Sequence, residues 1–139
     1  DTIGENFKNA LAKKPFLVKP NKEELESLFN VKTDTDEALL ELAKKVQKMG
    51  AENVLVSLGK DGAMLLTEDG NVFYAEAPKG KVVNTVGAGD SMVAGFVAEY
   101  TKSMDMEKAL KWGIAAGSAS AFAKNLASKE EIDALIGNL

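Results

Sequence analysis

The sequence contains no cysteine, no histidine and no arginine, and all 17 of its basic residues are lysines. Without cysteine the chain forms no disulfide and has no thiol chemistry. Without histidine or cysteine it lacks the groups that build the common catalytic triads and most zinc sites. Any catalytic chemistry must therefore come from Asp, Glu, Lys, hydroxyl groups, backbone amides or a metal ion that prefers oxygen ligands.

Concentrated positive charge and long apolar runs are also missing. The net charge is −4 and the lysines are spread along the chain. We therefore expect no nucleic acid as a partner, because nucleic-acid binding normally needs a basic face. No apolar run approaches the length of a membrane span, and the first residues do not resemble a signal peptide. We expect a cytoplasmic protein without a membrane partner.

Helix-like and strand-like segments alternate along the 139 residues of the chain. This length is enough for one domain, which we expect over residues 1–139. Strands that alternate with helices are typical of a parallel sheet, and the Asp-Gly pair within residues 68–71 predicts an antiparallel hairpin. The sequence therefore predicts an α/β fold. Such folds normally begin with a strand, so a chain that opens with a helix is expected to be part of a larger protein. Apolar periodicity predicts helices at 4–13, 21–30, 34–49, 89–101, 105–125 and 129–136, and strands at 16–18, 53–58, 63–67 and 72–76.

A glycine-rich turn is the most informative motif. Residues 84–90 read Asn-Thr-Val-Gly-Ala-Gly-Asp and lie between an apolar strand and a helix. The first turn of a helix exposes unpaired N–H groups and partial positive charge, and glycines let this backbone approach a phosphate closely. A carboxylate at Asp90 could take a proton from a hydroxyl that attacks this phosphate. The same pattern also fits a plain tight turn with Asp90 favouring the helix start, so spacing alone leaves both interpretations open.

Two better-known phosphate motifs fit this region less well. A dinucleotide-binding fingerprint needs a third glycine where Met92 stands. The P-loop pattern fails because Gly80-Lys81 is followed by Val82, where Ser or Thr is required.

Residues 84–96 closely resemble the C-terminal signature of the ribokinase (PfkB-type) carbohydrate kinases, in which Asp or Asn, Thr, a variable residue and Gly-Ala-Gly precede a catalytic Asp. The resemblance implies that Asp90 is the general base and that the backbone amides of Gly87, Ala88 and Gly89 form the anion hole for the transferred phosphoryl group. It also implies ATP and Mg²⁺ as cofactors. The expected fold is the C-terminal part of a ribokinase-like three-layer α/β/α fold, with parallel strands plus an antiparallel hairpin.

Three further segments resemble family motifs, and each has a structural alternative. Asn21 and Glu24 match an Asn-x-x-Glu motif that organises Mg²⁺ and phosphate through water, although the same spacing is a helix capping box. The segment from Ser57 through Gly59 to Gly62 resembles a nucleotide-contacting segment, although a plain loop explains it nearly as well. The small residues at 113–121 favour close helix packing, and the resemblance suggests that Ser118 lines the adenine slot.

The expected substrate follows from likeness alone. Residues 86–95 are most similar to family members that phosphorylate fructose 1-phosphate, and next to those that act on tagatose 6-phosphate. The N-terminal portion of the family, with its lid, sugar-binding residues and the usual homodimer contact, has no counterpart here. In the sugar-phosphate kinases of this family, the basic residues that hold the phosphate of the sugar include Arg, which this chain lacks. We therefore expect the chain alone to be inactive. An ATP-binding module without catalysis and a purely structural domain remain the alternatives.

Overall fold

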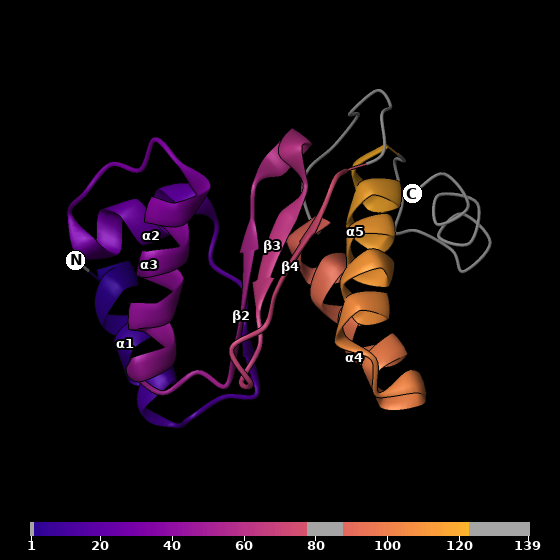
Figure 1. The fold of residues 1–139 in the computed structure, drawn as a ribbon, viewed down its shortest axis with the longest axis horizontal. Coiled ribbons are helices and arrows are strands. Elements are labelled where there is room, and N and C mark those ends of the chain that lie inside the picture. Colours follow the sequence, from indigo (N-terminus) through magenta and orange to yellow (C-terminus); the bar gives the residue numbers. More distant parts are fainter. Residues whose placement is uncertain (1, 78–87, 123–139) are drawn as a thin grey trace. The chain divides into compact units, whose positions relative to one another are not determined.

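The computed structural model of the chain describes residues 2–77 and 88–122 (Figure 1). Over these residues the order of helices and strands matches the sequence prediction, and every predicted boundary that falls within them lies within two residues of the observed one, while the predicted end of the last described helix, at 125, lies outside them. A short 3-10 turn, η1, was not predicted. The predicted helix at 129–136 and residues 84–87 of the glycine-rich turn lie outside the described residues. The elements are α1 (Thr2–Ala12), β1 (Leu17–Val18), α2 (Lys22–Phe29), α3 (Asp36–Lys48), β2 (Asn53–Ser57), η1 (Gly59–Asp61), β3 (Ala63–Leu66), β4 (Val72–Ala75), α4 (Ala88–Ser103) and α5 (Met106–Phe122).

The strands form one sheet in the order β1-β2-β3-β4. β1 pairs in parallel with β2, with Leu17 opposite Asn53 and Val18 opposite Val54. β2 connects to β3, and β3 to β4, through only five residues each, at 58–62 and 67–71. A parallel crossover needs a dozen or more residues, so both of these pairs are antiparallel. The sheet thus combines a parallel pair with an antiparallel hairpin, as predicted.

The described residues gather in two compact units, which we treat separately. The first consists of residues up to 58 together with 64–72, and the second consists of 59–63 together with residues from 73 onward. The prediction of one domain over residues 1–139 concerns the whole chain and stays a prediction.

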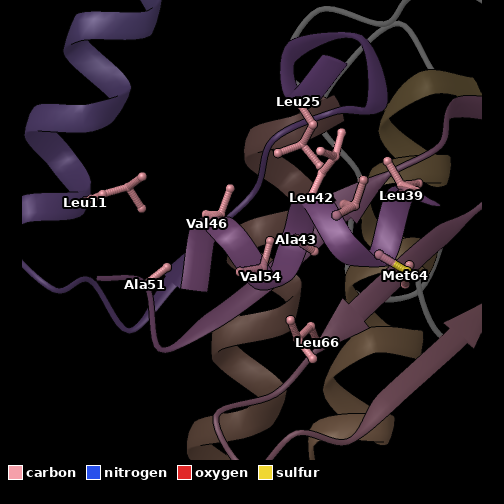
Figure 2. Packing of buried hydrophobic residues seen from close by; sticks show 11 residues of the cluster. Leu11, Leu25, Leu39, Leu42, Ala43, Val46, Ala51, Val54, Met64 and Leu66 are labelled. Atoms are coloured by element: carbon pink, nitrogen blue, oxygen red, sulfur yellow. The ribbon is translucent and has the colours of Figure 1, made fainter. Parts of the chain in front are cut away.

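Alternating side chains of β2 and β3 build the core of the first unit. Val54, Met64 and Leu66 point toward the side chains of helices α1 to α3 (Figure 2), and Val56 belongs to the same buried cluster. The intervening Leu55 is also fully buried, as is Leu65 on β3, so both faces of these strands are covered. This burial explains why the strands read as continuous apolar runs. The core cluster contains Leu11, Leu25, Leu39, Leu42, Ala43, Val46, Ala51, Val54, Val56, Met64 and Leu66.

A buried amide fastens one end of this sheet. Asn53 is fully buried, and its Nδ2 donates to the carbonyl of Phe16 at 2.8 Å while its Oδ1 accepts from the N–H of Glu68 at 2.9 Å. Gln47 on α3 donates to the carbonyl of Thr67 at 2.8 Å. These bonds satisfy polar groups that would otherwise be costly to bury, and they tie β1, α3 and the β3–β4 turn to the start of β2.

The segment after α2 is held by a second buried polar group. The Glu26 carboxylate accepts from the N–H of Thr33 at 2.7 Å and from its hydroxyl at 2.9 Å. These bonds, the backbone one first, stabilise the charged form and lower the pKa of Glu26, with further help from Lys32 and Lys22 against the opposing effect of burial. The carboxylate therefore connects α2 to the loop that leads into α3.

The second unit contains two helices that run side by side, α4 and α5 (Figure 1). They are joined by only Met104 and Asp105, so consecutive helix directions are opposed. Asp105 accepts the N–H of Lys108 at 3.1 Å and caps the start of α5. The buried apolar side chains of the pair, among the described residues, are Phe96, Ala109, Leu110, Ile114, Ala115, Ala116 and Ala119, and Glu99 of α4 is buried as well.

Glu26 makes the stability of the chain sensitive to acid. Its pKa in the folded state lies below its ordinary value of 4.5, so its stabilising contribution is complete above that value and is lost as the pH falls through the folded pKa. We expect Glu26→Gln to lower the urea midpoint at pH 7 and to flatten the fall of stability below pH 4.5. Glu23→Gln, which changes an exposed carboxylate on the same helix, is the control. Equal acid slopes for Glu26→Gln and the unsubstituted chain would contradict this account.

Gly62 is required by a close backbone contact. Its φ is +100°, and an added Cβ would overlap the carbonyl oxygen of Ala75 and lie 2.8 Å from the Cα of Glu76. Gly70, with φ +87° and nothing within 4 Å of an added Cβ, is a matched control. We expect Gly70→Ala to cost about 1 kcal/mol from backbone strain alone, and Gly62→Ala to cost roughly a further 1–3 kcal/mol from the overlap. Urea unfolding measures both, and equal losses would refute the contact.

Candidate functional site

Three predicted site residues lie together where the parallel strands β1 and β2 end. The N–H of Ser57, the last residue of β2, donates to the carbonyl of Pro20 at 3.1 Å, and Ser57 forms a parallel β-bridge with Asn21, which follows β1. α2 starts at the next residue and carries Glu24 in its first turn. In open α/β sheets ligands bind outside the carboxyl ends of the strands, so this is the position where a ligand is expected.

The capping box predicted for Asn21 and Glu24 is confirmed. The Asn21 Oδ1 accepts the N–H of Glu24 at 2.7 Å, and the Glu24 Oε1 accepts the N–H of Asn21 at 2.9 Å. The cap uses one carboxylate oxygen of Glu24, and the side chain is exposed. The first turn of α2 thus presents a negative charge next to the end of β2.

The donor set suits a magnesium ion that keeps most of its water. Mg²⁺ prefers hard oxygen ligands and usually binds through one or two carboxylates together with substrate phosphates. Among residues 2–77 and 88–122 there is no cluster of three or more acidic side chains able to hold a metal directly. The carboxylate of Glu24 and the amide oxygen of Asn21 fit an indirect role through water.

Gly59 and Gly62, the two glycines that follow β2, differ in how much space surrounds them. Gly59 has φ +61°, and an added Cβ would meet nothing within 4 Å, so open space borders its backbone. Gly62 is instead required by the fold, as its overlap with Ala75 shows. The predicted nucleotide contacts of Gly59 and Gly62 stay predictions, and Gly62 in addition shapes the turn.

The second unit carries the predicted base. Asp90 lies in the first turn of α4 and is exposed, and Gly89 beside it is half-buried. The first N–H groups of a helix have no carbonyl partner within it, and the helix dipole favours an anion there. Gly87 lies outside the described residues, so of the predicted anion hole the structure describes only the backbone of Ala88 and Gly89, and its role stays a prediction.

Ser118 on α5 is half-buried and faces away from α4. Gly95 of α4 approaches Ala116, and each helical residue turns by about 100°, so Ser118 lies roughly 200° around the helix from that contact. The small residues of α5 serve helix packing at Gly113 and Ala116, as predicted. The contact of Ser118 with adenine stays a prediction.

The structure thus brings Asn21, Glu24 and Ser57 together in the first unit, and Gly89 and Asp90 together in the second. Sequence reasoning missed the polar contacts of Asn53, because a buried amide leaves no periodic signal. None of the helices in the described part of the chain has the length and apolar character needed to cross a bilayer.

Comparison with known proteins decides the family, because the model of the pfkB family carbohydrate kinases matches residues 3–133. The chain belongs to the pfkB family. It is 43% identical to the 1-phosphofructokinase of Bacillus subtilis over 98% of this chain and 45% of the relative, and 40% identical to the D-tagatose-1-phosphate kinase of Bacillus licheniformis over 90% of this chain and 41% of the relative. The chain therefore spans less than half the length of these pfkB-family relatives.

A solved pfkB-family structure confirms the predicted ribokinase-like fold. The phosphofructokinase-2 of Escherichia coli, in complex with substrates and products, superposes with a TM-score of 0.88 at 33% identity, over 98% of this chain and 45% of the other.

Substitution of Glu24 separates capping from a role toward Mg²⁺. A capping box accepts Gln as well as Glu, so Glu24→Gln should leave the free energy of unfolding almost unchanged. If the charge acts through water on the metal, the Mg²⁺ concentration for half-maximal activity of the complete kinase should rise roughly tenfold. Asn21→Ala provides the opposite control, because it removes the cap and should cost about 1 kcal/mol. An unchanged Mg²⁺ requirement in Glu24→Gln would reduce Glu24 to a capping residue.

Proposed function

We propose that this chain is the C-terminal, nucleotide-binding and catalytic part of an ATP-dependent sugar-phosphate kinase, and that its substrate is fructose 1-phosphate, converted to fructose 1,6-bisphosphate. The observation that carries the proposal is an exposed carboxylate, Asp90, in the first turn of a helix that follows a glycine-rich turn. The 43% identity to a 1-phosphofructokinase supports the substrate.

In the proposed reaction Asp90 accepts the proton of the attacking sugar hydroxyl. The hydroxyl oxygen forms a bond to the γ-phosphorus of ATP as the bond from that phosphorus to the β,γ-bridging oxygen breaks, and ADP leaves. The amides of Gly87, Ala88 and Gly89 donate to the oxygens of the transferred group. Fixed donors of this kind stabilise the charge that develops there without reorganising during the reaction.

Other residues bind the nucleotide in this proposal. Ser57 and Gly59 contact ATP phosphates or ribose at the end of β2, and Ser118 borders the adenine. Asn21 and Glu24 hold water molecules around Mg²⁺. When bound, the ion neutralises charge on the β- and γ-phosphates.

The sugar side of the site is assigned to a part of the kinase outside this chain. The chain has no arginine to hold the phosphate group of the sugar substrate, and it spans less than half the length of its relatives. We assign the sugar-binding residues, the lid and the homodimer contact to that other part. The chain alone should then bind Mg-ATP without turning over.

A tagatose phosphate is the second candidate substrate. A relative named D-tagatose-1-phosphate kinase is 40% identical over 90% of this chain, close to the value for the fructose enzyme. Comparing kcat/KM of the complete kinase for fructose 1-phosphate, tagatose 1-phosphate and tagatose 6-phosphate decides between them. A preference for either tagatose phosphate would replace the proposed substrate and leave the proposed chemistry intact.

Asp90→Asn tests the base. Because a general base acts in the transition state, kcat of the complete kinase should fall about 10²- to 10⁴-fold while the Kd for Mg-ATP changes little. Asp105→Asn is the matched control, since Asp105 begins the neighbouring helix as a cap, where Asn serves equally well. Steady-state kinetics and calorimetry provide both values. Full turnover in Asp90→Asn would leave an ATP-binding module or a structural domain as the function of the motif.

A further inference from the structure

Two glycines let α4 and α5 approach unusually closely within the second unit. A Cβ added at Gly113 would lie 2.9 Å from the carbonyl oxygen of Met92 and 3.3 Å from the Cβ of Phe96. A Cβ added at Gly95 would lie 2.8 Å from the Cβ of Ala116 and 2.9 Å from the carbonyl oxygen of Trp112. Ordinary contacts begin near 3.4 Å, so neither position has room for a methyl group.

The contact at Gly113 falls on the first turns of α4. Met92 is two residues after Asp90, and its carbonyl belongs to the same helical backbone. A backbone atom cannot rotate away as a side-chain tip does. A methyl group at Gly113 therefore displaces the start of α4 by about 0.5 Å, the difference between 2.9 and 3.4 Å.

Glycine at these positions weakens the helices themselves. Gly is a poor residue for a helix interior, and alanine is the best. α5 uses alanine at the neighbouring buried positions Ala115, Ala116 and Ala119. The glycines are therefore explained by the short distance between the helices and not by helix formation.

We infer that Gly113, with Gly95 as a weaker partner, is a positioning residue that sets the location of Asp90 and of the first amides of α4 by allowing α5 to lie close. This inference rests on the proposed role of Asp90 as the base. Misplacement of a reacting group by about 1 Å can cost 10²-fold in rate, so a shift of half that size should cost roughly tenfold.

A double-mutant cycle in the complete kinase tests the inference. Gly113→Ala should lower kcat about tenfold with a smaller change in KM for ATP. In the Asp90→Asn background the same substitution should lower kcat by a smaller factor, because the displaced amides still slow the reaction but no base remains to be misplaced. Equal losses in both backgrounds would overturn the inference.

Two further variants separate positioning from lost stability. Lys111→Gly weakens α5 at an exposed position two residues from Gly113 without adding volume at the contact, so it should lower Tm and leave kcat unchanged. A tenfold loss of kcat in Lys111→Gly would overturn the inference.

Should Gly113→Ala not fold, Gly95→Ala takes its place in the same cycle. Its loss should be smaller and should be partly restored by Ala116→Gly, which removes the methyl group at 2.8 Å. A Gly95→Ala loss that persists undiminished in the Asp90→Asn background would count against positioning.

The outcome for Asp90→Asn alone keeps the two proposals apart. If that variant retains full turnover, the proposed base is wrong whatever Gly113→Ala does. If it loses turnover while Gly113→Ala retains it, only the positioning inference fails.

Discussion

The parallel pairing of β1 with β2 is the contact on which the first part of the site depends. The paired segment is short, with only two residues of β1 in register, yet it determines that Asn21 lies beside Ser57. The pairing is reinforced from the other end, where the buried side chain of Asn53 binds the carbonyl of Phe16. A shift of one residue would turn the buried side chains of β2 to the opposite face and separate the two site residues. The hydrogen bond of the Asn53 side chain and the apolar core therefore specify the same register of β1 against β2.

Much of this arrangement could be predicted because it follows from local patterns. Apolar periodicity located the helices and strands, the Asp-Gly pair located the hairpin, and the Asn-x-x-Glu spacing predicted the capping box that Asn21 and Glu24 form. The contacts that could not be predicted join residues distant in sequence. The Glu26 carboxylate can bind the N–H of Thr33 only after α2 ends and the chain turns. Gly62 lies against the backbone of Ala75 only once the strands on either side have paired. Such contacts depend on tertiary geometry, for which a single residue type gives no signal.

The two acidic side chains of the predicted site, Glu24 and Asp90, both lie in the first turn of a helix and also serve the fold. The capping box of α2 would accept Gln at position 24, but a carboxylate stands there. Asp90 lies in the first turn of α4, where the helix dipole favours a negative charge, and the proposed anion site adjoins it. A carboxylate repels a phosphate unless a metal ion or a transferable proton intervenes. Charge at these two positions therefore fits both a helix start and the proposed phosphoryl transfer.

The proposed phosphate donors are backbone amides, which differ from side-chain cations in how they can move. A side-chain cation follows its ligand by changing rotamer, whereas backbone N–H groups move only when their whole helix moves. In this chain the proposed phosphate donors are the backbone amides at the start of α4, and the base is attached to the same turn. The accuracy of the site then depends on where α4 lies, and within the second unit its neighbour α5 limits that position through Gly95 and Gly113. In this proposal, close packing of α4 against α5 keeps the phosphate donors and the base in place, so Gly95 and Gly113 become part of the requirement for catalysis.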